Sequence, residues 1–274
     1  MIVGKPIKSN GLLMGVFLGA LFFVIYIGGV QIALEGGALK WTLLLPAYLF
    51  LVLYIYLLVS KVTMKYILTD TGLQISWAFS QTVIPFDEIQ DVSVVTGRVN
   101  LVNILGASWP GFMIGMYELR GVGPAKFYAS DVYHEILMVR TRTGLTAITP
   151  DADFANALAD AVNTEIGHID TYEIHESEIG EIIDEDLGYM VLLGLNIIVI
   201  ATLCVYLAIF FPGSAAPRIS MLFLPLAVGL FVFNMVNASR IFHYAKMGAY
   251  GIWLIQLMVS IGFLVADFST IGFK

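Results

Sequence analysis

Charged residues are scarce in this sequence, and basic residues are fewer than acidic ones. Only 13% of the 274 residues are charged, and 14 Lys and Arg stand against 21 Asp and Glu, which gives a formal net charge of −7. A nucleic-acid partner requires a clustered basic surface, because the protein has to neutralise several phosphates at once. The few and scattered basic residues therefore argue against nucleic acid as a partner.

The sequence also lacks the residue patterns that usually carry catalysis. It has no Gly-x-Ser-x-Gly, no phosphate-binding glycine loop and no His-Glu-x-x-His, and none of its four histidines has a plausible nucleophile nearby in the sequence. The single cysteine, Cys204, can form no internal disulfide, and it lies in an apolar run where we expect it to pack as a small hydrophobe. We therefore expect no catalytic residue, no cofactor and no metal, and we predict that the protein is not an enzyme.

Long apolar runs are the most prominent feature that the sequence does have. Hydrophobic residues make up 58% of the chain, and its mean hydropathy is +0.85. A helix needs about 20 mostly apolar residues to cross about 30 Å of hydrocarbon. Five runs meet this requirement, at approximately 12–34, 42–60, 188–211, 219–239 and 249–267. We predict an integral membrane α-helical protein with about five transmembrane helices.

Basic residues near the ends of these runs predict the orientation of the chain, because positive residues are retained on the cytoplasmic side. One side of the membrane would hold Lys5, Lys8, Lys61, Lys65, Arg240 and Lys246, and the other side would hold only Lys40, Arg218 and Lys274. This bias predicts a multi-pass protein of the cell membrane with a cytoplasmic N-terminus, a cytoplasmic domain between the second and third spans, and an external C-terminus.

Between the second and third spans the pattern changes to short alternating segments, which are typical of antiparallel strands. A hairpin turn is predicted at Thr69-Asp70-Thr71-Gly72. The predicted strands are Val62–Leu68, Leu73–Trp77, Thr82–Phe86, Ile89–Val95, Met116–Arg120, Lys126–Ala129, Glu135–Arg142 and Leu145–Ile148. An amphipathic helix follows, with Thr149 as its N-terminal cap and Pro150 at its first position. Its apolar stripe consists of Phe154, Leu158, Ala161 and Val162.

Several stretches of this region match one family in their order and spacing. They are Tyr66–Ile75, Ile84–Val92, Gly106–Phe112 with Gly115–Tyr117, and Gly144–Asp151 with Phe154 and Leu158. Over approximately residues 62–163 the chain resembles the bacterial pleckstrin-homology (PH) domain membrane proteins. The resemblance implies a PH-like antiparallel β-barrel domain, strongly bent and capped by a C-terminal helix, that binds or scaffolds other molecules without catalysis.

Eukaryotic PH domains that bind phosphoinositides place basic residues around the first hairpin, because a multiply charged headgroup needs several cationic donors. In this sequence that hairpin turn contains Asp70 and no basic residue. We therefore do not expect headgroup recognition at this hairpin.

These patterns divide the chain into four parts. They are an N-terminal transmembrane hairpin at 1–61, a PH-like domain at 62–166, an acidic linker with a lead-in helix at 167–187, and a three-helix membrane region at 188–274. The linker contains His168 and His175 among carboxylates, which are possible ligands of a divalent metal, but their spacing matches no strong metal motif. The favoured interpretation is a solvated acidic segment whose apolar stripe forms a helix. The residues of that stripe are Ile179, Ile182, Ile183 and Leu187.

The segment Gly106–Gly115 is the most suggestive part of the PH-like region, because it carries large apolar residues in a sequence that looks too irregular for a strand. These residues are Trp109, Phe112, Met113 and Ile114. Exposed apolar loops usually contact something, so one interpretation is a docking loop for a partner protein or for the interfacial lipid layer. The other interpretation is that the side chains fill one end of the barrel or pack on the spans.

Polar residues within the spans are mostly uncharged, and we predict that Asn234 and Asn237 make hydrogen bonds between helices. Our leading hypothesis is a non-catalytic interaction or scaffolding module that is anchored in the membrane lipid bilayer and binds another membrane protein or a second copy of itself through its PH-like domain. The alternative is a lipid-responsive sensor or small permease with a ligand site among the transmembrane helices.

Overall fold

The computed structural model describes residues 2–97, 99–130, 135–174, 181–211 and 217–271. The chain forms two compact units, one made of residues 1–17 and 53–180 and the other of residues 18–52 and 181–274. Each unit is described by itself below. The predicted division of the chain into four parts stays a prediction.

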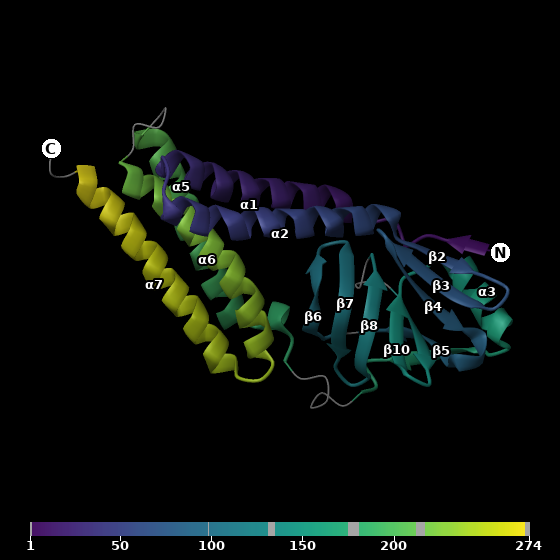
Figure 1. Cartoon of the computed structure of the whole chain (residues 1–274). Coiled ribbons are helices and arrows are strands. Elements are labelled where there is room, and N and C mark those ends of the chain that lie inside the picture. The colour runs from purple at the N-terminus through teal and green to yellow at the C-terminus, as the bar shows by residue number, and fades with distance from the viewer. Residues whose placement is uncertain (1, 98, 131–134, 175–180, 212–216, 272–274) are drawn as a thin grey trace. The chain divides into compact units, whose positions relative to one another are not determined.

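The five predicted spans are present as five long helices (Figure 1). They are α1 (Gly11–Ala33), α2 (Ala38–Thr63), α5 (Leu187–Phe210), α6 (Arg218–Phe242) and α7 (Lys246–Ile271). All five are long and apolar enough to cross a membrane. The length and composition of the chain therefore fit a membrane protein, as its apolar runs predict.

A four-stranded antiparallel sheet lies in the first unit, with strand order β1-β2-β3-β4. Its strands are β1 (Ile2–Gly4), β2 (Lys65–Leu68), β3 (Gly72–Trp77) and β4 (Ser80–Pro85). The predicted hairpin turn at 69–72 joins β2 to β3. The sequence did not predict β1, because a strand of three residues is too short to show an alternating pattern. It pairs with β2, which follows it by about sixty positions in the chain, with Ile2 opposite Leu68.

The remaining strands of this unit form a seven-stranded sheet with order β11-β5-β9-β10-β8-β7-β6. They are β5 (Ile89–Thr96), β6 (Leu101–Trp109), β7 (Phe112–Leu119), β8 (Gly123–Ala129), β9 (Ile136–Thr141), β10 (Gly144–Ile148) and β11 (Ile166–Asp170). A short 3-10 helix, η1 (Phe86–Glu88), precedes β5.

This sheet departs from the predicted antiparallel barrel in two respects. Strand β10 pairs with β8 in parallel, and β11 pairs with β5 in parallel. Among the described strands, the two end strands β6 and β11 each have one hydrogen-bonded neighbour, so the sheet is not closed. The structure therefore confirms a β-rich domain and does not show a barrel. Both parallel pairs join strands that are distant in sequence, which local alternation cannot reveal.

Helix α3 (Ala152–Val162) packs on the four-stranded sheet and on part of the seven-stranded sheet through a shared core. Phe154 and Leu158 are buried as predicted, whereas Ala161 is exposed and Ala155 and Ala159 are buried instead. The predicted cap was wrong: the side chain of Asp151 accepts a hydrogen bond from the Phe154 N–H.

Thr149, the predicted cap, is fully buried in the core of the domain. Instead of capping α3, its hydroxyl oxygen accepts a hydrogen bond of 2.9 Å from the Ser130 N–H. Next to it, the hydroxyl of Tyr66 donates to the Tyr128 carbonyl oxygen at 2.6 Å and accepts from the Thr149 N–H at 3.3 Å. Burial raises the pKa of Tyr66, so its phenol stays protonated and remains a donor.

The second unit packs its helices through two apolar clusters. One joins Val30, Ala33 and Leu44 to Leu222, and the other joins Tyr189, Ala238, Phe242, Ala249 and Trp253. Before α5, the described backbone from Glu181 to Asp186 contains only a 3-10 helix, η2 (Ile183–Glu185), rather than the predicted lead-in helix. Ile179, part of the predicted stripe, lies outside the described residues.

Asp186 links the start of α5 to the start of α7. Its Oδ1 accepts hydrogen bonds from the Tyr189 N–H at 2.6 Å and from the Tyr250 hydroxyl at 2.7 Å. Its Oδ2 lies 2.6 Å from the Lys246 ammonium, which also lies 2.6 Å from Glu181 Oε2. Burial alone raises the pKa of Asp186, but its hydrogen bonds and the charge of Lys246 outweigh burial and lower the pKa to about 2.

We expect this cluster to stabilise the second unit at neutral pH and to fail in acid. The pKa of Asp186 is lower in the folded state than its ordinary 3.8, so the stabilisation is present above that value and is lost as the pH falls toward about 2. Asp186→Asn keeps a good helix cap without the charge, whereas Asp186→Ala removes both. In detergent melting curves at neutral pH, Asp186→Ala should be less stable than Asp186→Asn by about 1 kcal/mol. The melting temperature of Asp186→Asn should also fall less than that of the wild type on acidification, and an identical fall in both would contradict this role.

Candidate functional site

The turn between β6 and β7 is attached to the first residues of α1. The Trp109 Nε1–H donates a hydrogen bond of 2.6 Å to the Gly11 carbonyl oxygen. The Trp109 ring lies 4.4 Å from the Phe112 ring and 5.6 Å from the ring of Tyr54 on α2, measured between centroids. Tyr54 in turn donates to the Gly15 carbonyl oxygen at 2.7 Å. The tip of this hairpin is therefore packed against both helices of the first unit.

Two glycines allow the backbone of the turn to approach α1 this closely. A Cβ on Gly11 would overlap the Gly111 carbonyl oxygen, and a Cβ on Gly111 would lie 2.6 Å from the Gly11 Cα. Gly111 also has a φ of +86°, a conformation that favours glycine. The Ser9 hydroxyl donates to the Gly111 carbonyl oxygen at 2.9 Å. The contact is therefore fixed by hydrogen bonds as well as by the absence of side chains.

The segment predicted to be an irregular loop is in fact the end of a β hairpin. β6 and β7 pair up to Trp109 and Phe112, and the turn between them is Pro110-Gly111. The segment looks irregular in sequence because Gly106 and Gly115 interrupt its apolar residues. These glycines face each other across the hairpin, where a Cβ on Gly106 would lie 2.6 Å from the Ile114 carbonyl oxygen. The close approach of the two strands explains the glycines.

The four side chains proposed for docking pack in or against the apolar cores of the domain. Phe112 is only 2% exposed and belongs to the core beneath α3. Trp109 and Ile114 are partly buried against the same core, and Met113 packs against the second core of the sheet. This geometry favours the packing interpretation of the segment. The sequence did not point to Gly11 and Ser9, because their contacts lie about a hundred positions away.

A second hairpin tip lies beside the last two turns of α2. The Ala78 N–H donates to the Thr63 hydroxyl at 2.6 Å, and the hydroxyls of Tyr56 and Ser80 lie 3.3 Å apart. Between these contacts Phe79 is 92% exposed. An exposed aromatic ring beside the end of a helix that is apolar enough to cross a membrane would suit the interfacial layer, where aromatic residues are enriched.

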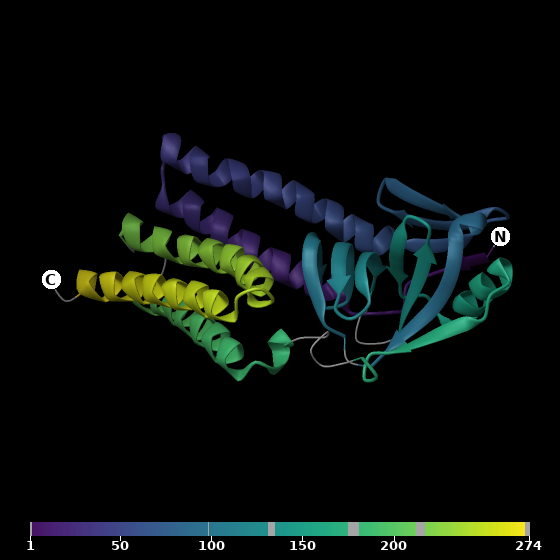
Figure 2. The ribbon, with the colours of Figure 1, turned by 90° about the horizontal axis from the view of Figure 1, so that it is seen from below.

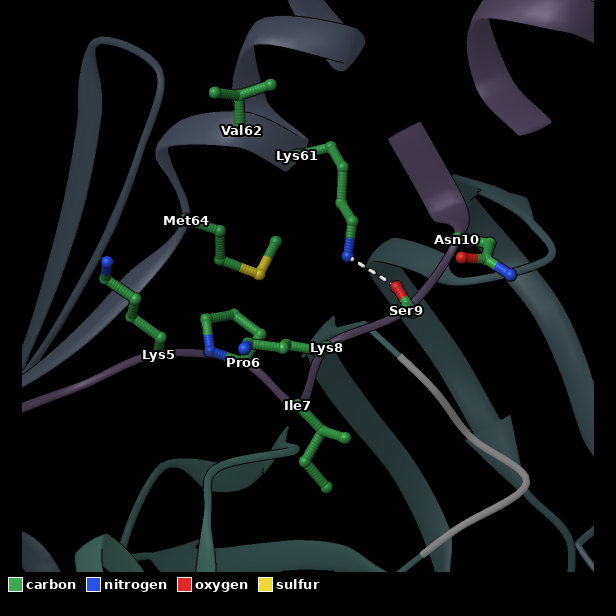
Figure 3. A pocket seen from close by; sticks show the side chains of 9 residues that line it. All are labelled: Lys5, Pro6, Ile7, Lys8, Ser9, Asn10, Lys61, Val62 and Met64. Atoms are coloured by element: carbon green, nitrogen blue, oxygen red, sulfur yellow. Dashed lines mark hydrogen bonds between the residues drawn. The ribbon is translucent and has the colours of Figure 1, made fainter. Parts of the chain in front are cut away.

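A basic recess lies where the chain enters α1 and leaves α2 (Figure 3). Its volume is about 480 Å³. The recess is lined by Lys5, Pro6, Ile7, Lys8, Ser9, Asn10, Lys61, Val62 and Met64. The Lys61 ammonium donates a hydrogen bond of 2.9 Å to the Ser9 hydroxyl, the same group that contacts the β6–β7 turn. The sequence indicated these lysines as markers of orientation, and the structure brings three of them to one recess.

The fold and these contacts are consistent with the predicted resemblance, and a comparison with known families supports it. Residues 64–163 match the family model of the bacterial PH domain. Over this segment, called the PH domain from here on, the chain is similar to that family. No curated protein and no solved structure matches the chain. The matched segment runs from the end of α2 through α3, so β1, β11 and the three lysines of the recess lie outside it.

The PH domain presents one exposed apolar edge strand, β6. It stands at the end of the seven-stranded sheet and pairs only with β7 among the described strands. Its register with β7 shifts between Asn103 and Leu105, which marks a β-bulge at Ile104. At this bulge Ile104 is 45% exposed and Leu105 is 74% exposed. The edge therefore offers backbone hydrogen-bonding groups beside apolar side chains.

The histidines of the predicted linker do not form a metal site in the part of the chain that the structure describes. His168 is exposed on β11, and His175 lies outside the described residues. Within the described ranges, no group of three or more His, Cys, Asp or Glu could hold a metal ion.

The two asparagines predicted to bond between helices differ in their contacts. Asn234 on α6 donates to Gln256 Oε1 on α7 at 2.8 Å, and Gln256 Nε2 donates to the Ala227 carbonyl oxygen of α6 at 3.3 Å. Asn237 instead donates to the Phe233 carbonyl oxygen of its own helix. Asn196, which was not among the predicted contacts, joins α5 to α7 through the Trp253 carbonyl oxygen at 3.1 Å. The amides of Asn234, Gln256 and Asn196 therefore hold these helices together.

Proposed function

We propose that this protein is a membrane-anchored, non-catalytic interaction module, in which the edge strand β6 of the PH domain binds another membrane protein or a second copy of the chain. An exposed edge strand can add a strand from a partner, because its backbone donors and acceptors lack a neighbour on one side. The observation that carries the proposal is the pair Ile104 and Leu105, which expose apolar surface on this edge.

The attachment of β6 limits the kind of partner. Trp109 ends β6, and its hydrogen bond to Gly11 holds that end of the strand at the first residue of α1, a helix suited to span the bilayer. A partner that pairs with β6 would therefore have to lie at the membrane surface. The basic residues near the helix ends support a cytoplasmic location for the N-terminus and the PH domain, with the C-terminus outside the cell.

The alternative, a sensor or small permease with a ligand site among the membrane helices, has less support. Such a site needs polar groups that converge on a cavity. The amides of Asn234 and Gln256 bond to each other, and Gln256 also bonds to a backbone carbonyl. These two amides therefore make hydrogen bonds between α6 and α7.

The proposal is tested by placing a charge on the edge strand. Leu105→Lys should prevent strand addition, since edge lysines block pairing with another chain. Tyr172→Lys is the matched control, because both wild-type side chains are 74% exposed in the same unit and only Leu105 lies on β6. In mild detergent, affinity purification of the full chain should recover a stoichiometric membrane partner or a homo-oligomer.

We expect Leu105→Lys to lose most of the recovered complex and Tyr172→Lys to keep it. A wild-type protein that is purely monomeric and without a partner would contradict the proposed function, as would an equal yield of complex from both variants. Size-exclusion chromatography with light scattering distinguishes self-association from a second protein.

A further inference from the structure

The turn between β3 and β4 has an unusual composition for a turn in water. It consists of Ala78 and Phe79, because Trp77 and Ser80 are the last paired residues of the hairpin. Short hairpin turns usually contain Gly, Asn or Asp, which are polar or tolerate a positive φ. Here Ala78 takes a φ of +43°, and the next position carries an apolar ring. These residues suit a turn that does not face bulk water.

Phe79 is the most exposed large apolar residue in the part of the chain that the structure describes, at 92%. Its aromatic neighbour has a different environment. The ring of Trp77 lies 4.6 Å from the ring of Tyr128, measured between centroids, and packs against the core of the domain. The segment 106–115, for which the sequence left contact with interfacial lipid open, also packs against this core. Phe79 is therefore the better candidate for a lipid contact.

The whole hairpin is uncharged. Asp70 precedes β3 and Asp87 follows β4, and no residue between them carries a charge. A charged side chain is costly to move out of water into an apolar environment. The β3–β4 hairpin can therefore approach a membrane without that cost.

Two contacts hold the tip of this hairpin beside the last two turns of α2 (Figure 2). The Ala78 N–H donates to the Thr63 hydroxyl at 2.6 Å, and this hydroxyl donates to the Val59 carbonyl oxygen at 2.7 Å. The hydroxyls of Ser80 and Tyr56 lie 3.3 Å apart. Tyr56 precedes Thr63 by about 10 Å along the helix axis, at 1.5 Å per residue. The tip therefore extends back along α2 rather than ending beyond it.

The position along α2 gives the depth of the tip relative to a bilayer. Thr63 is the last residue of α2, a helix long and apolar enough to cross a membrane. The end of such a helix lies in the interfacial layer. Phe79 stands between the two turn residues that contact α2, so it lies at the same level. Along this stretch Ile55 is 50% exposed and Val62 is 63% exposed, so the ring continues an apolar helix surface.

We propose that the β3–β4 hairpin inserts Phe79 into the interfacial layer of the lipid bilayer beside α2. Aromatic rings are enriched in this layer. The tip lies at the opposite end of β3 from the turn at 69–72, the hairpin at which phosphoinositide-binding PH domains place basic residues. This contact with lipid needs no cationic side chain. The inference rests on the membrane anchorage in the proposed function and is independent of the partner of β6.

The test measures the depth of a spin label on the full chain in phosphatidylcholine vesicles. Cys204→Ser removes the native cysteine, and Phe79→Cys then places a nitroxide label at the tip. Asp70→Cys is the matched control, because it labels the exposed turn at the other end of β3. Leu49→Cys, at a side chain that is 65% exposed on α2, is the lipid reference. Each label is exposed to oxygen, which concentrates in lipid, and to a nickel chelate, which stays in water.

We expect the ratio of oxygen to nickel collisions to be several-fold higher at position 79 than at position 70, and to approach the ratio at position 49. Melting temperatures verify that the labelled variants are folded. Equal ratios at positions 79 and 70 would overturn the proposal. A label at position 79 that is shielded from both reagents would also overturn it, because protein would then cover the ring.

Two further results separate this inference from the proposed function. Addition of Leu105→Lys to the labelled Phe79→Cys chain should leave the collision ratio at position 79 unchanged, whatever happens to the partner of β6. A change in that ratio would contradict the independence of the two surfaces. A label at position 49 that is as accessible to nickel as the label at position 70 would overturn the membrane anchorage and this inference together.

Discussion

Replacing Phe154 with Ala should lower the free energy of unfolding of the PH domain by about 3–5 kcal/mol, because it removes the largest buried side chain of α3. Phe154 is 1% exposed, and its ring centroid lies 6.0 Å from that of Tyr66. Its ring also lies directly beneath Gly4 of β1, where a Cβ would be 2.8 Å from the Phe154 Cγ. The substitution should therefore loosen α3 and the N-terminal strand together.

The loss should appear as a fall of more than about 10 °C in the melting temperature of the domain, given its length of roughly a hundred residues. Phe79→Ala is the matched control, since it makes the same chemical change at a ring that is 92% exposed. In detergent, this control should change the stability by no more than about 0.5 kcal/mol. If Phe154→Ala melted within a few degrees of the wild type, α3 would not be what closes the core of the domain.

Replacing Gly111 with Ala should detach the β6–β7 turn from α1. The change costs about 1–2 kcal/mol for a side chain at positive φ. It also places a Cβ 2.6 Å from the Gly11 Cα and N, which are backbone atoms that cannot rotate away. We therefore expect the free energy of unfolding to fall by at least about 3 kcal/mol and the hydrogen bond from Trp109 to Gly11 to be lost.

Gly37→Ala separates strain from overlap. Gly37 has a φ of +93°, close to the +86° of Gly111, but a Cβ there would meet nothing within 4 Å. Its cost should stay near the 1–2 kcal/mol of strain. Differential scanning fluorimetry and limited proteolysis around Ser9 measure the two effects. Equal destabilisation by both variants, without new cleavage near Ser9, would contradict a specific contact between the turn and α1.

The consequence of this contact is that the PH domain is attached to α1 and α2 by more than its covalent links. Trp109, Gly111 and Ser9 attach one hairpin to α1, while Thr63 and Tyr56 attach another to α2. An edge strand fixed in this way keeps a defined orientation relative to the first residues of α1 and the last turns of α2. Because the strand is already ordered, less conformational entropy is lost when a partner binds to it.

The correct sequence predictions rest on local patterns. The five spans were predicted because length and apolarity along one stretch decide whether a helix can cross a bilayer. The strands from β2 to β5 followed from alternation, and the turn at 69–72 from its Thr, Asp and Gly residues. The buried positions of Phe154 and Leu158 followed from their spacing on one helix face. The family resemblance over the PH domain has the same origin, since it depends on the order of these local signals.

The sequence predictions were wrong where the local pattern around a residue suggests one contact and the folded chain makes another. Thr149 looks like a helix cap, but a buried hydrogen bond to Ser130 uses its hydroxyl, and Asp151 caps α3 instead. The segment at 106–115 looks like a loop because glycines interrupt its apolar residues, but these glycines allow strands β6 and β7 to approach each other closely. The contact of Thr149 lies 19 positions away, beyond the window in which a pattern can be recognised, whereas Gly106 and Gly115 interrupt the alternation that would have shown the two strands.

The sequence by itself determined that the chain has five apolar runs, each long enough for a membrane helix, around a segment similar to the bacterial PH domain, because both properties are encoded in consecutive residues. Only the tertiary structure decided that β1 joins β2, that β8 pairs with β10 in parallel, and that Gly11 lies against Gly111. It alone brought Lys61 to Lys5 and Lys8, more than fifty positions away along the chain. The physical reason is that these contacts depend on how separate elements pack, and no local periodicity records which distant surface a residue will meet.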